Sequence, residues 1–175
     1  HTGFLIFASY IGRLGDTEMT THQALMAFES LGFIGANAFG IASGTLAAQY
    51  LGESNPKRAE DSVLYSAKIG IGTLSGVGIF FAFCAPWLVG LFSSNPDVLS
   101  LGVECMYIAA FAQPLMACTD VFAGALRGAG DTKTPLAAAL FGPLLIRPIL
   151  CYILCFPLQM GLIGIWIGST FDWII

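Results

Sequence analysis

The stretch IGIGTLSGVGIFFAFCAPWLVGLFSSNP, residues 69–96, contains no charged side chain. A helix that crosses the hydrocarbon core of a membrane needs about 20 predominantly apolar residues. Residues 30–52 and 148–171 form two further charge-free runs, and each is also long enough for one crossing. Surface helices of soluble proteins carry charges on one face at helical spacing. Three charge-free runs in one chain therefore predict an all-α integral membrane protein.

The composition of the whole chain agrees with a membrane protein and excludes nucleic-acid binding. Of its 175 residues, 56% are hydrophobic and 10% are charged, against about 45–50% and 25% in soluble domains. Seven Lys and Arg against eleven Asp and Glu give a net charge of −4. The chain therefore lacks the basic surface that neutralises phosphates, and we expect no nucleic-acid partner.

The residue types that carry out catalysis or bind metals are not arranged for either role. Isolated cysteines inside apolar runs predict neither a disulfide framework nor a zinc site. His22 has no Ser/His/Asp or paired-carboxylate pattern beside it in the sequence, as acid–base catalysis would need. The glycines in LRGAGDTKTP, residues 126–135, lack the Gly-Lys-Ser/Thr order of a phosphate loop. We expect no metal, no cofactor and no enzymatic activity.

Apolar runs and the residues between them predict a polytopic bundle of about six transmembrane helices. Pro86 interrupts the helical hydrogen bonds, so a short amphipathic turn at residues 86–92 is expected after the third helix. The first helix is too short to cross a membrane, and the last ends inside an apolar run. We therefore expect both to be truncated, in a fragment of a longer protein. The expected ranges are 2–14, 18–51, 56–84, 96–125, 135–156 and 161–175.

Three helix starts share one local signal, an Asn or Thr directly before a proline. Such a side chain can cap the free N–H groups of a new helix, and proline is favoured at the first helical position. We therefore expect helices to begin at the three prolines. The pairs are Asn55–Pro56, Asn95–Pro96 and Thr134–Pro135.

The distribution of positive charge predicts the orientation in the membrane. Lys57 and Arg58 lie in the loop at residues 52–60, and Arg127 and Lys133 lie in the loop at residues 126–134. Loops that stay in the cytoplasm collect Lys and Arg. We expect a multi-pass protein of the cell (inner) membrane with both loops in the cytoplasm.

Polar side chains inside the predicted spans are candidate functional residues, because they are costly in a membrane. Glu29 lies on the helix face that carries Ala36 and Gly40, since seven residues make nearly two full turns. Gln113 and Asp120 share a face beside Pro114, which can kink the helix. Each candidate either lines a cavity for a substrate or ion or forms a buried hydrogen bond between helices. The candidate cavity residues are Glu29, Asn37, Gln113 and Asp120.

Arg147 and Asp172 are the candidate ion pair. They lie on either side of the predicted loop that begins near Pro157, each about ten residues from it and therefore about 15 Å deep at 1.5 Å per residue. Removing one partner of a buried pair leaves an uncompensated charge. We expect a structural pair that holds the last two helices together, with a role in transport as the alternative.

Several of these stretches, in their order and spacing, resemble the multidrug and toxic compound extrusion (MATE) family. LRGAGDTKTP at residues 126–135, followed by Ile146-Arg147-Pro148, resembles the hairpin between the fourth and fifth helices of a MATE half. ESLGF at residues 29–33, ASGTLAAQYLG at residues 42–52 and GIW at residues 164–166 resemble its second and last helices. The loop motif residues are Arg127, Gly128, Gly130, Asp131, Thr132 and Pro135.

The resemblance implies a fold of two six-helix halves around a central cavity. Residues 1–175 would then be a partial C-terminal lobe, from the end of helix seven to most of helix twelve, and the N-terminal half would be its missing partner. Family members are secondary antiporters that export organic cations, drugs or other amphiphilic compounds in exchange for protons or sodium ions by alternating access. The partners expected are a small-molecule substrate and membrane lipid, and the fragment alone is expected to be inactive.

The resemblance also bears on the coupling ion and leaves two alternatives open. The sodium-coupled branch has an acidic residue eleven positions before the loop arginine, where this chain has Met116. This departure favours protons over sodium. Glu53 and Ser54 also replace the usual Ala-Gly of the family after Leu51-Gly52, at the end of the second helix. The alternatives are a lipid-linked saccharide flippase of the wider superfamily, which should show clustered cavity arginines, and a non-transporting membrane assembly module.

Overall fold

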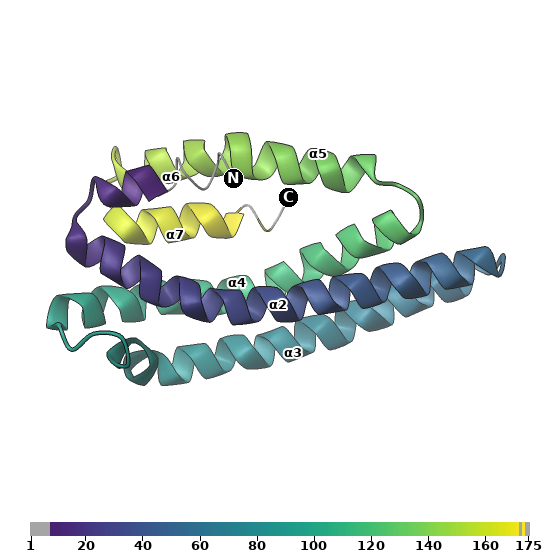
Figure 1. Ribbon diagram of the computed structural model, residues 1–175, viewed down its shortest axis with the longest axis horizontal. Helices are drawn as coiled ribbons and strands as arrows, with labels where there is room; N and C mark the ends of the chain where they lie inside the picture. Colours follow the sequence, from purple (N-terminus) through teal and green to yellow (C-terminus); the bar gives the residue numbers. More distant parts are fainter. Residues whose placement is uncertain (1–7, 172, 174–175) are drawn as a thin grey trace.

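The computed structural model describes residues 8–171 and 173, which are helical apart from short loops, without any strand. Figure 1 shows α2, α3 and α4 together as one layer, with α5 and α6 opposite them and α7 in between. Residues 8–12 are helical and precede α2. The elements are α2 (Asp16–Gly52), α3 (Pro56–Gly90), α4 (Pro96–Gly128), α5 (Lys133–Phe141), the π-helix η1 (Gly142–Ile146), α6 (Arg147–Cys155) and α7 (Gly161–Phe171).

The prediction of an all-α membrane bundle is confirmed. Within the part of the chain that the structure describes, four helices are long and apolar enough to cross a membrane: α2, α3, α4 and the continuous stretch Lys133–Cys155. The shorter α7 and the helical residues 8–12 are the described parts of the last and first predicted segments. The loops at residues 52–60 and 126–134 lie at the same end of the bundle (Figure 1), as an alternating multi-pass path requires.

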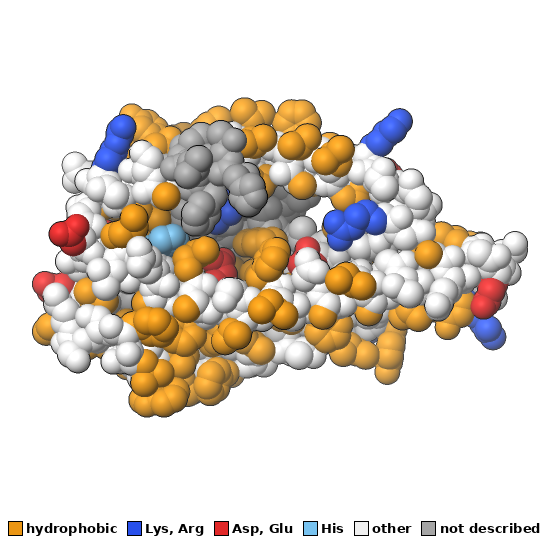
Figure 2. All heavy atoms as spheres, viewed as in Figure 1, with side chains coloured by type: hydrophobic (Ala, Val, Ile, Leu, Met, Phe, Trp, Pro, Cys, Tyr) orange, Lys and Arg blue, Asp and Glu red, His pale blue; other side chains and the backbone are white. Residues whose placement is uncertain are grey.

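Large apolar side chains cover much of the outer surface of the bundle. Figure 2 shows them spread along the helices, with charged side chains mostly toward the two ends. Phe83 is 85% exposed, and Trp87 and Ile34 are also largely exposed. A soluble monomer rarely leaves so much contiguous apolar surface in water. This surface suits contact with lipid.

Pro86 does not end the third helix, so the predicted turn at residues 86–92 is wrong. α3 continues through Pro86 to Gly90. Neighbouring helices can hold a proline within a membrane helix, and here one face of the turns around it is buried: Ala85 and Val89 are both 0% exposed. Packing of these side chains compensates for the backbone hydrogen bond that Pro86 cannot make.

Two of the three predicted helix caps are confirmed and the third is wrong. Asn55 Oδ1 accepts a hydrogen bond from the Arg58 N–H, and Asn95 Oδ1 accepts one from the Asp97 N–H. α5 instead begins at Lys133, before Pro135. Asp131 caps it, because its Oδ1 accepts from the Lys133 and Thr134 N–H groups and its Oδ2 accepts from the Thr134 hydroxyl. A carboxylate that reaches three donors displaces Thr134 as the cap.

The fifth span contains an unexpected π-helix. Sequence patterns predict one helix over residues 135–156, but η1 (Gly142–Ile146) separates α5 from α6. Pro148 follows this segment by two residues, and a proline ring in a regular α-helix clashes with the carbonyl group four residues earlier. A wider turn relieves that clash. Such π segments occur frequently at functional sites.

Glycines bring the backbones of α2 and α4 into direct contact. A Cβ atom on Gly40 would lie 2.6 Å from the Asp120 carbonyl oxygen, and one on Gly44 would lie 2.6 Å from that of Gly124. From the α4 side, a Cβ on Gly124 would meet the carbonyl oxygen of Gly40, and one on Gly128 would meet that of Gly44. Small residues allow this approach in membranes. The face of α2 that carries Gly40 and Gly44 is therefore an interface with α4.

The turn after α2 uses a serine where a glycine is favoured. The Ser54 N–H donates to the Leu51 carbonyl and the Asn55 N–H donates to the Tyr50 carbonyl, which is the hydrogen-bond pattern of a Schellman turn. In such a turn the first residue after the helix adopts the left-handed backbone conformation. Here that residue is Ser54, which has a φ of 56°. Residues with a Cβ are strained in this region.

We expect Ser54→Gly to stabilise the protein by about 1 kcal/mol, because glycine adopts the left-handed conformation without steric cost. The measurement is the thermal unfolding midpoint in detergent, with Ser54→Ala as the matched control that should give no gain. A midpoint that falls with Ser54→Gly would contradict the strain at this turn.

Candidate functional site

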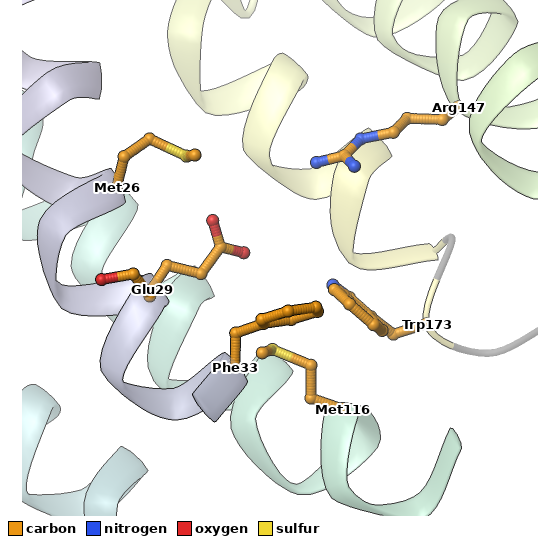
Figure 3. A pocket seen from close by; sticks show the side chains of 7 residues that line it. Met26, Glu29, Phe33, Met116, Arg147 and Trp173 are labelled. Atoms are coloured by element: carbon orange, nitrogen blue, oxygen red, sulfur yellow. The ribbon is translucent and has the colours of Figure 1, made fainter. Parts of the chain in front are cut away.

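A pocket of about 280 Å³ lies between α2, α4 and the start of α6, close to Trp173. Figure 3 shows its lining side chains pointing toward a common space. Among the described residues that line it, two are charged, one of each sign, within a mostly apolar wall. The lining residues are Met26, Glu29, Ser30, Phe33, Met116, Arg147 and Trp173.

One face of α2 supplies more than half of this lining. Met26, Glu29, Ser30 and Phe33 have the spacing of three, four and seven residues that places side chains on one face of an α-helix. The Ser30 hydroxyl donates to the Ala27 carbonyl oxygen at 2.7 Å, so its donor is used within α2. The Glu29 carboxylate reaches into the pocket (Figure 3).

Arg147 enters the pocket from the opposite wall. It is the first residue of α6, directly after η1, and its guanidinium points toward the side of the pocket that Glu29 faces (Figure 3). The guanidinium attracts the Glu29 carboxylate, and it is also within electrostatic range of His22. Among the described lining residues, one negative side chain thus faces one positive side chain.

Trp173 closes the pocket on the side of the chain end and is held at two points. The Thr119 hydroxyl on α4 donates to its carbonyl oxygen, and its ring lies 6.3 Å from that of Phe33, centroid to centroid. Its indole N–H is buried and has no hydrogen-bond partner among the described residues. In Figure 3 this nitrogen faces the space between Glu29 and Arg147.

The other candidate cavity residues lie apart from this pocket. Gln113 is fully buried between helices, with its side chain against Gly32 and Gly78. Its Nε2 donates to the Ala109 carbonyl oxygen at 3.4 Å. Gln113 does not line this pocket, because the glycine at position 32 lets its amide pack into the α2–α4 interface.

Asn37 and Asp120 lie further along the bundle. Asn37 lines a wider groove of about 680 Å³ together with Gln49 and Arg127. Asp120 is half-buried, its Oδ2 has no hydrogen-bond partner among the described residues, and Arg127 attracts its carboxylate. The structure thus separates the candidates into a pocket around Glu29 and a region near the end of α4.

The predicted pair of Arg147 with Asp172 lies partly outside the described residues, because Asp172 is not among them. Among the described residues, Arg147 attracts the Glu29 carboxylate. Among the described residues, no three His, Cys, Asp or Glu side chains come together as they would in a metal site.

The loop motif at residues 126–134 forms a tight helix-to-helix turn. The Gly130 N–H donates to the Arg127 carbonyl and the Asp131 N–H donates to the Leu126 carbonyl, which again is a Schellman turn. Gly130 takes the left-handed position, with φ of 91°. Hydrogen bonds from Thr134 hold the pKa of Asp131 below its usual value. Gly128 packs on Gly44, Thr132 precedes α5, and Pro135 is buried.

The MatE family model matches residues 2–153. The chain belongs to the MatE family. Members are transporters rather than enzymes, and this chain is a multi-pass integral membrane protein. The recognition of the family from LRGAGDTKTP and its companion motifs is confirmed.

Relatives and solved structures of MatE-type transporters cover almost the whole chain. The "Probable multidrug resistance protein NorM" of Brucella suis biovar 1 (strain 1330) is 30% identical over 163 residues, which are 90% of this chain and 35% of that protein. The "Multidrug resistance protein NorM" of Burkholderia vietnamiensis is 30% identical over 172 residues, 95% of this chain and 37% of that protein. The chain therefore spans little more than a third of these relatives.

Two solved structures share the fold. A MATE protein in complex with MaD5 superimposes with a TM-score of 0.90 at 17% identity, over 99% of this chain and 39% of that one. A MOP superfamily transporter from Pyrococcus furiosus superimposes with a TM-score of 0.89 at 17% identity, over 99% of this chain and 38% of that one.

Sequence reasoning missed most of the pocket wall. It singled out Glu29 and Arg147 for their charge, but not Met26, Phe33 or Trp173 as neighbours. The helical spacing of Met26 and Phe33 around Glu29 was an available signal. No comparable sequence signal pointed to Trp173, because its position depends on how α7 packs against α6 and α4.

Proposed function

We propose that this chain is the C-terminal lobe of a secondary antiporter that exports organic cations, drugs or other amphiphilic compounds by alternating access. The observation that carries the proposal is the pocket around Glu29, where one carboxylate stands in an apolar wall of methionine and aromatic side chains. Methionine adapts to irregular ligands, and aromatic faces attract organic cations. Membership of the MatE family supports the same class of activity.

In the complete transporter, residues 1–175 would form the part of the C-terminal lobe from the end of helix seven to most of helix twelve, and an N-terminal half would close the cavity. The loops at residues 52–60 and 126–134 would lie in the cytoplasm of a cell (inner) membrane, since they carry most of the cations. A lipid-linked saccharide would favour several arginines around the cavity, and Arg147 is the only one among the described residues that line the pocket.

Protons are the coupling ion that we favour. Met116 faces the pocket at the position where the resemblance puts an acidic residue in the sodium-coupled branch. A thioether is a poor ligand for a hard cation such as sodium, which prefers oxygen. Efflux by the complete transporter should therefore collapse when a protonophore removes the pH gradient and should persist without a sodium gradient. Dependence on sodium alone would contradict this assignment.

We expect Glu29→Gln to slow export of the cationic dye ethidium by about 10-fold or more, because a charged hydrogen-bond partner contributes roughly 1.5–3 kcal/mol to binding. The measurement is efflux from cells preloaded with ethidium that express the complete transporter. Expression level and membrane insertion are checked in parallel for each variant.

Glu104→Gln is the matched control for this experiment. It makes the same chemical change on α4, where Glu104 is exposed, and it should leave efflux unchanged. Equal efflux by wild type and Glu29→Gln would remove Glu29 from the binding site. Dye retention unaffected by the wild-type transporter would overturn the proposed function itself.

A further inference from the structure

The two halves of the fifth span differ in how firmly they are held, and α6 is the firmly held half. A Cβ atom on Gly164 of α7 would lie 2.8 Å from the Leu154 carbonyl oxygen. A Cβ on Gly168 would lie 3.0 Å from the Cys151 backbone nitrogen. The Cys151 thiol also donates to the Ile165 carbonyl oxygen at 3.4 Å. α6 and α7 are therefore in backbone contact and move as one body.

α5 is the loosely held half. Of its nine residues, Pro135 alone is buried, while Leu136 and Phe141 are exposed. In Figure 1, α7 runs beside α6 and ends before it reaches α5. Within the described part of the chain, α5 therefore depends mainly on the turn at its start and on η1 at its end. Segments with few buried apolar contacts are the ones that move most readily.

η1 joins the two halves and combines several features that bend helices. Gly142 and Pro143 begin it, and Pro148 follows it. Neither proline can donate a backbone hydrogen bond, and the Arg147 N–H donates to the Gly142 carbonyl five residues earlier instead of four. Sharp kinks in helices occur at prolines and at π turns. The fifth span therefore bends most easily at η1.

A second pocket, of about 350 Å³, lies between α4 and α5 and gives α5 room to move. We call it the α4–α5 pocket. Ala138 lines it from α5 and Cys118 lines it from α4. It extends from Trp173, which also lines the candidate site, to Thr134 beside the loop at residues 126–134.

We propose that α5 is a gate that swings about η1 toward α4 and closes the α4–α5 pocket, while α6 stays fixed on α7. The turn before α5 is the second pivot, with Gly130 in the left-handed conformation. Because Trp173 borders both pockets, closure would separate the candidate site from the end of the bundle that carries the loop at residues 126–134. The gating role rests on the proposed export function, whereas the movement itself does not.

Disulfide formation measures the movement. In the complete transporter in lipid nanodiscs, Ala138→Cys puts a thiol across the pocket from Cys118. A disulfide needs Cα atoms within about 4.4–6.8 Å, so it forms when α5 approaches α4. The fraction linked at set ratios of reduced and oxidised glutathione gives the effective concentration of the two thiols, and mass spectrometry identifies the linked peptides. We expect most of the Ala138→Cys protein to become linked to Cys118.

Ala137→Cys is the matched control for the direction of approach. Ala137 is exposed and lies about 100° around the helix from Ala138, so its thiol should not reach Cys118. Linkage of both variants to the same extent, or of neither, in protein that elutes as a monodisperse peak would overturn the gate.

A second pair of variants locates the hinge in the Ala138→Cys background. Leu145 in η1 and Ile149 in α6 have similar exposure, 52% and 56%, so Leu145→Gly and Ile149→Gly make comparable changes on either side of Arg147. Glycine adds backbone freedom, and we expect Leu145→Gly to raise the effective concentration about 2- to 5-fold. Ile149→Gly should leave it unchanged, because α6 is fixed on α7. Equal effects of the two variants, or none from either, would overturn the hinge at η1.

Ethidium export by the same protein tests the gating role. We expect oxidation of Ala138→Cys to stop export and dithiothreitol to restore it. Export that continues with the disulfide in place would overturn the gate. A wild-type transporter that exports no ethidium would instead reject the proposed antiport function, and disulfide formation would still decide whether α5 moves about η1.

Discussion

Replacing Gly44 and Gly124 together with valine is expected to abolish the folded state. A Cβ on Gly44 would lie 2.6 Å from the Gly124 carbonyl oxygen, and one on Gly124 would meet the Gly40 carbonyl oxygen. Neither obstacle is a flexible side chain, so α2 and α4 must move apart along their whole contact. Overpacking in a rigid core costs about 1–3 kcal/mol per site and occasionally more. We expect loss of the monodisperse peak in size-exclusion chromatography of the detergent-solubilised protein.

The matched control is the same double change on the outer face of α3. Gly72 and Gly76 have the same four-residue spacing and have nothing within 4 Å of an added Cβ among the described residues. Gly72→Val with Gly76→Val should leave the elution profile intact. If both double variants behave alike, the close approach of α2 and α4 is not what holds the bundle together.

Arg147→Met is expected to destabilise the protein by about 1–3 kcal/mol, as measured by unfolding of the solubilised protein in SDS. It removes the cation that attracts the Glu29 carboxylate and leaves that carboxylate in a largely apolar pocket. Leaving a polar group without its partner costs about 1–3 kcal/mol, less than breaking a fully buried ion pair, because both side chains are only half-buried. Adding Glu29→Gln removes the stranded charge. The double variant should therefore recover a large part of the loss.

A pair of double-mutant cycles identifies the partner of Arg147. Coupling of about 1–3 kcal/mol between Arg147→Met and Glu29→Gln is the signature of groups that interact directly. The same cycle with Asp172→Leu tests the pair that the sequence predicts between the last two helices. Additive effects with Glu29 and strong coupling with Asp172 would assign Arg147 to a structural role and contradict its place in the pocket.

Local signals in the sequence were sufficient for most helix boundaries. Asn55 and Asn95 cap their helices as predicted, because the cap and its N–H partners are only two or three residues apart. The two failures have different origins. Pro86 is held inside α3 by packing against other helices, which local rules do not contain. Thr134 loses its role to Asp131, a stronger cap only three residues earlier in the sequence.

The site was less predictable than the fold. Charge alone pointed to Glu29 and Arg147, since ionisable groups in a membrane are costly. Helical spacing could not place Gln113, whose burial depends on Gly32 in another helix. It also could not predict that Arg147 faces Glu29, because η1 changes the register of the fifth span just before Arg147.

The π-helix has a genetic consequence. A π turn holds one more residue than an α turn, and each residue of an α-helix adds about 100° of rotation. Deleting a single codon within residues 142–146 would therefore leave a regular α turn, and α6 would face nearly the same way as before. The same deletion within α5 would turn Arg147 by about 100° relative to the start of that helix. The π-helix is thus the place in the fifth span where a length change of one residue keeps Arg147 facing the pocket, and alignments of this lobe should put a one-residue gap there.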